Sequence, residues 1–138
     1  MFELTVMPRF YETDAFGHVN NTVVTGWFET ARSPLFELFN TEGNKPAELP
    51  LILARIEVDF VGQIYYGSDV LLRTGIERLG NSSFVVLHQA WQNGKLVARG
   101  KAVQVHFEHD KQASSPIPAT FRQVLEQHLG ALPEEEQR

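Results

Sequence analysis

A carboxylate, a glycine and two asparagines lie within eight residues near the start of the chain, in the order Asp14, Gly17, Asn20 and Asn21. Glycine permits a tight turn, and asparagine favours the N-cap position of a helix. The first N–H groups of a helix have no partner within it and carry partial positive charge, so they can hold a developing oxyanion. The carboxylate and these donors suit attack on a carbonyl group, although simple Asx-turns and helix caps use the same residue types.

The helix that would follow these residues is indicated by apolar positions that recur every three or four residues between Val24 and Phe39. Pro34 lies inside this run and predicts a new turn or a kink, because proline lacks an N–H and clashes with the preceding turn. Residues 2–10 alternate loosely and predict a strand before the site. The breaker-rich residues 41–50 predict a surface loop after the helix.

The rest of the chain has mainly β periodicity. We predict strands at residues 52–61, 70–79, 84–92 and 95–107, and then a short amphipathic helix at residues 118–132 that ends near Gly130. One long helix against an antiparallel sheet gives an α+β fold with two layers.

Asn93 and Gly94 are the preferred pair for a two-residue type I′ turn, which sets the register of the two strands beside it. Gln92 would then pair with Lys95. Further along, a row of small side chains would face the neighbouring strand, with Ala98, Gly100 and Ala102 opposite Gln89, Leu87 and Val85. We predict that the helix at residues 24–39 packs into this row.

The other face of the same hairpin would combine apolar side chains with His88, Arg99 and Lys101. A face of this kind is consistent with a subunit contact or an anionic ligand. It is equally consistent with basic side chains whose stems lie over apolar neighbours while their charges stay in water.

Composition excludes several classes of protein. With 138 residues, 43% of them hydrophobic, the chain can fill one core, and we expect a single domain at residues 1–132 with a flexible acidic tail at residues 133–138. The absence of cysteine excludes disulfides, a thiolate nucleophile and a cysteine-ligated zinc site. The net charge of −5 and the scattered basic residues argue against nucleic acid. Without a signal-like start or a long apolar run, we expect a cytoplasmic protein that does not enter a membrane.

Two stretches of the chain resemble the 4-hydroxybenzoyl-CoA thioesterase-like branch of the hotdog-fold acyl-CoA thioesterases. They are Arg9-Phe-Tyr-Glu-Thr-Asp14-Ala-Phe-Gly17-His18-Val-Asn20-Asn21 and Trp27-Phe-Glu-Thr-Ala-Arg32. The resemblance implies a hotdog fold, in which a curved antiparallel sheet of about five strands wraps a long helix. It also implies a homodimer or homotetramer with its sites at the subunit boundary.

The resemblance assigns functions to individual residues. Asp14 would be the nucleophile or general base toward an acyl-CoA thioester, and the backbone N–H of Asn21 would polarise the thioester carbonyl. Gly17 and His18 would belong to the same turn, and His18 either orients Asp14 or bonds only to backbone. Many relatives have tyrosine where this chain has Val24, which changes the acyl pocket.

The remaining substrate contacts are less specific. The candidates are Phe16, Asn20, Trp27 and Phe60 for the acyl part, Ser83 by its position in relatives, and Arg55, Arg99 and Lys101 for the CoA phosphates. We predict no cofactor. We also predict no metal site at His106 and His109, because residues 106 and 109 of a strand would point to opposite faces. Two alternatives stay open: an acyl-CoA or acyl-carrier-protein binding module without turnover, and a hotdog dehydratase or hydratase.

Overall fold

A computed structural model describes residues 1–39, 49–130 and 132 of the chain. The predicted loop at residues 41–50 and the predicted tail at residues 133–138 lie almost wholly outside this range. The elements in chain order are β1 (Phe2–Val6), the 3-10 helix η1 (Phe10–Glu12), α1 (Asn21–Ala31), α2 (Ser33–Leu38), β2 (Leu51–Phe60), β3 (Val70–Leu79), β4 (Ser83–Gln92), β5 (Lys95–Glu108), β6 (Ala113–Ser114) and α3 (Ala119–Glu126). No helix in the described ranges is long and apolar enough to cross a membrane.

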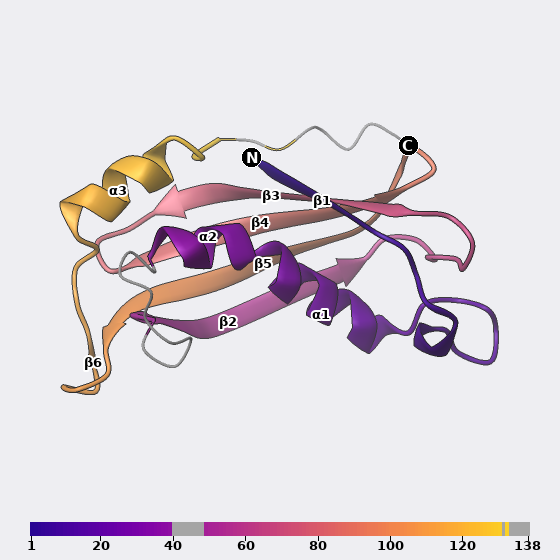
Figure 1. Cartoon of the computed structure of the whole chain (residues 1–138), viewed down its shortest axis with the longest axis horizontal. Coiled ribbons are helices and arrows are strands. Elements are labelled where there is room, and N and C mark those ends of the chain that lie inside the picture. The colour runs from indigo at the N-terminus through magenta and orange to yellow at the C-terminus, as the bar shows by residue number, and fades with distance from the viewer. Residues whose placement is uncertain (40–48, 131, 133–138) are drawn as a thin grey trace.

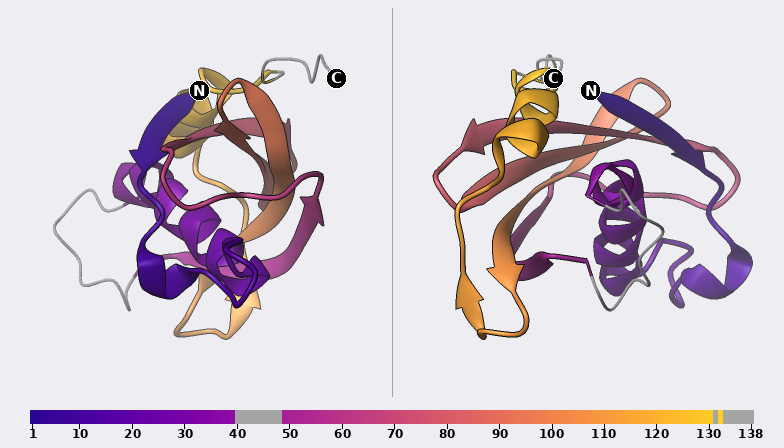
Figure 2. Two further views of the ribbon diagram at one scale, coloured as in Figure 1. Left: turned by 90° about the vertical axis from the view of Figure 1, so that its right-hand side faces the viewer. Right: turned by 60° about the vertical axis from the view of Figure 1, so that its left-hand side comes forward.

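Five antiparallel strands form a sheet in the order β1-β3-β4-β5-β2, and the short β6 adds to the end of β5. The sheet curls around α1 and α2, which run along its concave side (Figures 1 and 2). This arrangement confirms the α+β prediction of a long helix wrapped by a curved antiparallel sheet.

The predicted helix at residues 24–39 is two helices that meet at Arg32. Pro34 lies in the first turn of α2, where N–H groups have no partner within the helix. The missing N–H of proline therefore costs no hydrogen bond there. The kink predicted from Pro34 is therefore confirmed. The first strand ends earlier than predicted, at Val6, and η1 follows it. The last helix is also shorter than predicted, because α3 ends at Glu126 rather than near Gly130.

The turn of the β4–β5 hairpin forms as predicted, but the register beyond it does not. Asn93 and Gly94 have φ of 53° and 79°, as a type I′ turn requires, and Gln92 pairs with Lys95. A bulge at Val97 then shifts β5 by one residue. The observed pairs are Ala90 with Ala98, His88 with Gly100 and Val86 with Ala102.

This shift corrects the predicted faces of the hairpin. His88, Val86 and Ala90 are buried on the side of the helix, whereas Arg99 and Lys101 remain on the outer face. The small-residue row does receive the helix, as predicted. A Cβ at Gly100 would lie only 2.9 Å from the Glu57 carbonyl oxygen and 3.0 Å from the Phe28 ring, so the close approach requires glycine.

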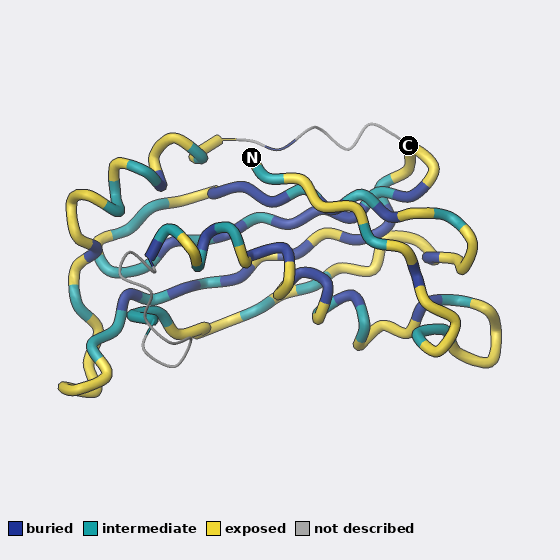
Figure 3. The backbone as a smooth tube through the Cα atoms, viewed as in Figure 1, coloured by how far each residue is buried: buried dark blue, intermediate teal, exposed yellow. Residues whose placement is uncertain are grey.

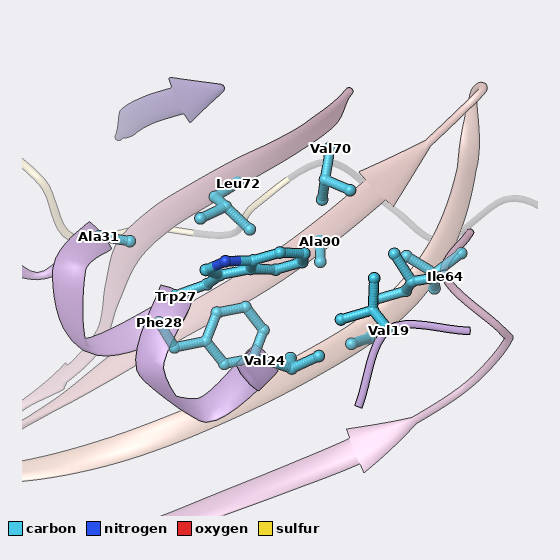
Figure 4. Close-up of a cluster of buried hydrophobic side chains, with 11 residues drawn as sticks. Val19, Val24, Trp27, Phe28, Ala31, Ile64, Val70, Leu72 and Ala90 are labelled. Carbon is cyan, nitrogen blue, oxygen red and sulfur yellow. The ribbon is translucent and has the colours of Figure 1, made fainter. Parts of the chain in front are cut away.

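The core lies between the helices and the concave face of the sheet, where Figure 3 shows the buried positions. One cluster joins α1 to the strands, and Figure 4 shows how Trp27 and Phe28 point from the helix toward β3 and β4. A second cluster lies under α2 and α3 and includes Leu35, Phe84 and Leu125. The first cluster holds the helix whose N-terminus carries the candidate site.

Candidate active site

Asp14 lies in a tight turn whose main chain fixes one of its carboxylate oxygens. Its Oδ1 accepts hydrogen bonds from the N–H of Phe16 at 2.8 Å and from the N–H of His18 at 3.2 Å. The Asp14 N–H in turn donates to the His18 carbonyl at 2.8 Å, and Gly17 has a φ of 81°, which favours glycine. Among the described residues Oδ2 has no hydrogen-bond partner, so this exposed oxygen is available to a substrate or a water molecule.

Helix α1 begins directly after this turn. Asn20 is the N-cap, and its Oδ1 accepts from the Thr22 N–H at 3.0 Å. Asn21 is the first helical residue and is exposed, and its N–H has no acceptor in the described part of the chain. The positive end of the helix dipole is at the same place. Within the described chain, a carboxylate oxygen and an N–H donor without partners therefore lie at the two ends of one short segment, residues 14–21.

Exposed aromatic side chains surround the turn. Phe16 is 81% exposed, and Phe10 meets Tyr66 edge-on with ring centroids 5.8 Å apart. The His18 ring packs edge-on against Tyr65 at 5.2 Å, so His18 contacts Asp14 through its main chain rather than its imidazole. Sequence analysis missed Tyr65, because its segment between two strands carries no motif.

The remaining predicted contacts are dispersed. Val24 and Trp27 belong to the buried cluster under α1, and Phe60 is half-exposed at the end of β2. Ser83 begins β4, whereas the other end of that strand, at Gln92, hydrogen-bonds to Tyr65 beside the Asp14 turn. Within one chain, Ser83 and Asp14 are thus at opposite ends of the sheet.

The three predicted CoA-phosphate ligands are exposed on the face of the sheet opposite α1, and each has an acidic partner. Their nitrogen–oxygen distances are 2.9 Å for Arg55–Glu57, 3.2 Å for Arg99–Asp59 and 3.1 Å for Lys101–Glu77. Exposed pairs of this kind are weak. The structure does not bring these side chains to the Asp14 turn of their own chain.

A second polar group lies at the other end of α1, in the core. Arg32 is 1% exposed, and its Nη1 lies 3.1 Å from Nε2 of His88, whose Nδ1 is 3.2 Å from the Thr74 hydroxyl. Burial, with a further contribution from the Arg32 charge, lowers the pKa of His88 to about 3. Burial also lowers the pKa of Arg32. The Phe28 ring stacks on His88 with the ring centroids 4.7 Å apart.

Comparison with known proteins identifies the family. A model of the family described as the thioesterase-like superfamily matches residues 8–125. The chain belongs to the thioesterase-like superfamily. This assignment confirms the resemblance in residues 9–32, and the match covers the Asp14 turn, helices α1 and α2 and every strand of the sheet except β1.

Solved structures share the hotdog fold of this superfamily member. A protein from Bacillus stearothermophilus described as a predicted thioesterase is 41% identical, with a TM-score of 0.89 over 96% of this chain and 98% of that one. A thioesterase from Thermus thermophilus, solved with coenzyme A and zinc, is 31% identical, with a TM-score of 0.79 over 89% of this chain and 95% of that one. A 1,4-dihydroxy-2-naphthoyl-CoA hydrolase from a Synechococcus strain is 28% identical over 90% of this chain and 89% of its own length.

Among the described residues, no group of three or more His, Asp or Glu side chains could hold a metal ion. His106 and His109, which carried the metal alternative, have other partners. Nδ1 of His106 lies 2.8 Å from the Ser115 hydroxyl, and Nε2 of His109 lies 2.8 Å from the Leu49 carbonyl oxygen.

Proposed function

We propose that this protein hydrolyses an acyl-CoA thioester to the free acid and CoA, with Asp14 as the catalytic carboxylate. The observation that carries the proposal is the unequal environment of its two oxygens. Two main-chain N–H groups hold Oδ1, whereas Oδ2 has no hydrogen-bond partner among the described residues, and α1 begins at Asn21, shortly after this turn. A carboxylate that is oriented but not neutralised suits attack on a carbonyl.

The thioester carbonyl oxygen would accept a hydrogen bond from the Asn21 N–H, which stabilises the negative charge that develops there. Two routes use the same geometry. Asp14 can add to the carbonyl carbon, so that the C–S bond breaks, CoA thiolate leaves and water hydrolyses the resulting anhydride. Alternatively, Asp14 takes a proton from water while the hydroxide adds, and CoA leaves as the thiolate and is then protonated.

An Asp14→Asn variant tests this function. The side-chain amide oxygen of the introduced asparagine can still accept from the N–H groups of Phe16 and His18, so we expect the turn and the melting temperature to be retained. Loss of the carboxylate should lower kcat at least ~10²-fold, the usual contribution of an acid–base group. The measurement is thiol release from a panel of acyl-CoAs, with aromatic acyl groups included because the Synechococcus relative acts on a naphthoyl-CoA.

Asp110→Asn is the matched control, because it makes the same chemical change at an exposed carboxylate beyond the end of β5. It should retain wild-type thiol release. An Asp14→Asn protein with full activity would contradict the mechanism. If the wild-type protein binds acyl-CoA without releasing thiol, the binding-module alternative is correct, and release of a dehydrated or hydrated acyl-CoA would identify the dehydratase or hydratase alternative.

We also propose that the protein is a homodimer or homotetramer. Among the described residues, strand β2 pairs with β5 on one side and has no strand on the other, and it exposes the apolar side chains of Ile52, Leu53 and Phe60. An edge strand with exposed apolar residues favours pairing with another strand. Light scattering on the purified full chain should give two or four times the 15.6 kDa chain mass, and a monomer at micromolar concentration would contradict the proposal. An oligomer would also allow Ser83, Arg55, Arg99 and Lys101 to act at a neighbouring subunit's site.

A further inference from the structure

The loop between β2 and β3, residues 61–69, lies against the main chain that leads into α1. The Val19 N–H donates to the Ile64 carbonyl at 2.8 Å, and Figure 4 shows their side chains next to each other. One residue further along the loop, Tyr65 forms an antiparallel β-bridge with His18, and the two rings meet edge-on. The loop is therefore paired with the main chain just before the helix.

His18 is the residue through which this pairing reaches Asp14. The His18 N–H donates to Oδ1 of Asp14 at 3.2 Å, and the His18 carbonyl accepts from the Asp14 N–H at 2.8 Å. The main chain of His18 thus holds both the backbone and one carboxylate oxygen of Asp14. Since Tyr65 pairs with His18, a shift of Tyr65 would move the groups that orient the carboxylate.

Gln92 connects the β2–β3 loop to the sheet. It is the last residue of β4 and is only 3% exposed. Its Oε1 accepts from the Tyr65 N–H at 2.9 Å, and its Nε2 donates to the carbonyl oxygens of Tyr65 at 2.8 Å and Ser68 at 2.9 Å. A glutamine amide has one acceptor oxygen and two N–H donors, and all three are used here. The side chain therefore fits this loop more specifically than a buried apolar residue or a carboxylate would.

Other contacts attach the loop ahead of Tyr65. The Val61 N–H donates to the Val97 carbonyl at 3.0 Å, and Ile64 packs in the buried cluster under α1. Tyr65, in contrast, is 52% exposed. Between the loop and the end of the β4–β5 hairpin lies a hollow of about 570 Å³ that both Tyr65 and Gln92 line. Hydrogen bonds to Gln92, rather than packed side chains, therefore hold Tyr65 on this side.

We propose that Gln92 is a positioning residue for the thioester reaction. It fixes Tyr65 and, through the main chain of His18, keeps Asp14 in the orientation in which its carboxylate reacts. The inference rests on the proposed thioesterase function. Gln92 acts through the loop and not on the substrate. Its effect can still be large, because a misplacement of reacting groups by about 1 Å can cost about 10²-fold in rate.

Gln92→Met tests the inference, because methionine has a similar length but makes none of the three hydrogen bonds. We expect kcat to fall about tenfold or more while KM stays within about threefold, since the carboxylate is misplaced and the contacts to acyl-CoA remain. Gln104→Met is the matched control. Gln104 is also a strand glutamine that is 3% exposed, but it pairs with Phe84 at the other end of β4. Any loss of stability in this control should leave the kcat of the folded protein unchanged.

Gln92→Glu gives a readout that a general loss of stability would not produce. The introduced carboxylate can accept from the Tyr65 N–H, but it can donate to the carbonyl oxygens of the loop only when it is protonated. Burial raises the pKa of such a carboxyl. The kcat of Gln92→Glu relative to wild type should therefore rise as the pH is lowered from about 8 to about 5, whereas the ratio for Gln92→Met should stay level. The nearby charged or titratable groups, Lys95, Asp69 and His18, are the same in all three proteins, so the ratios cancel their contribution.

Hydrogen exchange tests the same link without an assay of activity. In Gln92→Met the Tyr65 N–H should exchange faster than in wild type, because its acceptor is gone. The N–H groups of Val19 and Asp14 should also exchange faster, because their acceptors lie in the loop and in His18. In Gln104→Met all three should exchange as in wild type. If only the Tyr65 N–H exchanges faster in Gln92→Met, the loop does not position Asp14 and the inference is wrong.

The outcomes distinguish this inference from the proposed function. If the wild-type protein releases thiol and folded Gln92→Met keeps full kcat, or if Gln104→Met loses kcat equally, the inference is wrong and the function stands. If the wild-type protein releases no thiol, the function is wrong, and faster exchange at Asp14 in Gln92→Met would still show that Gln92 positions this carboxylate. If Gln92→Met does not fold, Gln92→Glu decides, and a kcat ratio that is independent of pH contradicts the inference.

Discussion

The two ends of helix α1 carry polar groups in opposite environments. At its N-terminus, Asp14 is exposed and the main chain holds only one of its oxygens. At its C-terminus, Arg32, His88 and Thr74 are each about 1% exposed and bond to one another across the core. Asp14 and Arg32 both belong to the stretches that resemble the thioesterase signature. One signature therefore contains the carboxylate that we propose as catalytic and an arginine that belongs to the core.

Perturbed pKa values often mark functional sites, but in this molecule the group with the largest such shift is in the core. The pKa of His88 is lowered to about 3 by burial first and by the Arg32 charge second. Because arginine can only donate hydrogen bonds, Nε2 of His88 must accept from Arg32, and Nδ1–H donates to the Thr74 hydroxyl. A proton on Nε2 would remove the acceptor. The network thus holds one tautomer of a neutral histidine, which suits a structural function.

Arg32→Ala should have the largest effect on stability. The variant removes a buried side chain, leaves a cavity beneath the junction of α1 and α2, and deprives His88 Nε2 of its donor. Large-to-small changes in a core cost about 2–5 kcal/mol. Urea unfolding should show a loss of this size. The activity per folded molecule should change much less than in Asp14→Asn, because the Asp14 turn is at the other end of α1.

Arg32→Met separates the effect of losing the buried charge from the effect of losing side-chain volume. Methionine fills most of the same space, so the loss of stability should be smaller than for Arg32→Ala. The buried Nε of Arg32 has no partner among the described residues, so its removal leaves no further group unpaired. If Arg32→Ala instead abolished activity in a protein of wild-type stability, the division between a chemical and a core end of the helix would be wrong.

At the exposed N-terminal end of α1, much of the structure could be predicted from the sequence. The turn before α1 depends on neighbouring residues, namely Gly17 for its positive φ and Asn20 for its cap, and short-range patterns report such features well. The break between α1 and α2 follows from Pro34 for the same reason. The limits of β2 to β5 also agree closely, because each of these strands is a run of β-branched and apolar residues between turn residues.

The polar group at the buried end of α1 could not be predicted, because the position of His88 depends on a single bulge in β5. The turn at Asn93-Gly94 was predicted correctly, but the extra residue at Val97 changes which β4 residues share a face with each later residue of β5. His88 was therefore predicted on the outer face, whereas it packs beneath α1. Arg32 carries no pattern that indicates burial, since arginine is mostly exposed in proteins. Its position follows only from the tertiary contact with His88.

The pH dependence of the unfolding free energy should show a smaller effect than Arg32→Ala, and it depends directly on buried His88. In the folded protein the pKa of His88 is about 3, whereas an unfolded histidine titrates near ~6.5. Between these values the unfolded chain binds more protons than the folded chain, so stability falls as pH decreases. The stabilising contribution of neutral His88 is complete above about pH 6.5 and is lost progressively toward pH 3, at no more than about 1.4 kcal/mol per pH unit.

His88→Gln should flatten this dependence, and the measurement is the urea unfolding free energy of both proteins at several pH values between about 4.5 and 7.5, a window that spans the titration of an unfolded histidine. His106 and His128 also have a pKa lowered by burial, so they contribute a slope of the same sign that the variant keeps. The difference between the two proteins therefore isolates His88. If His88→Gln follows the wild-type curve throughout, His88 is not held neutral in the folded protein. The Arg32 guanidinium would then need a different acceptor in the core.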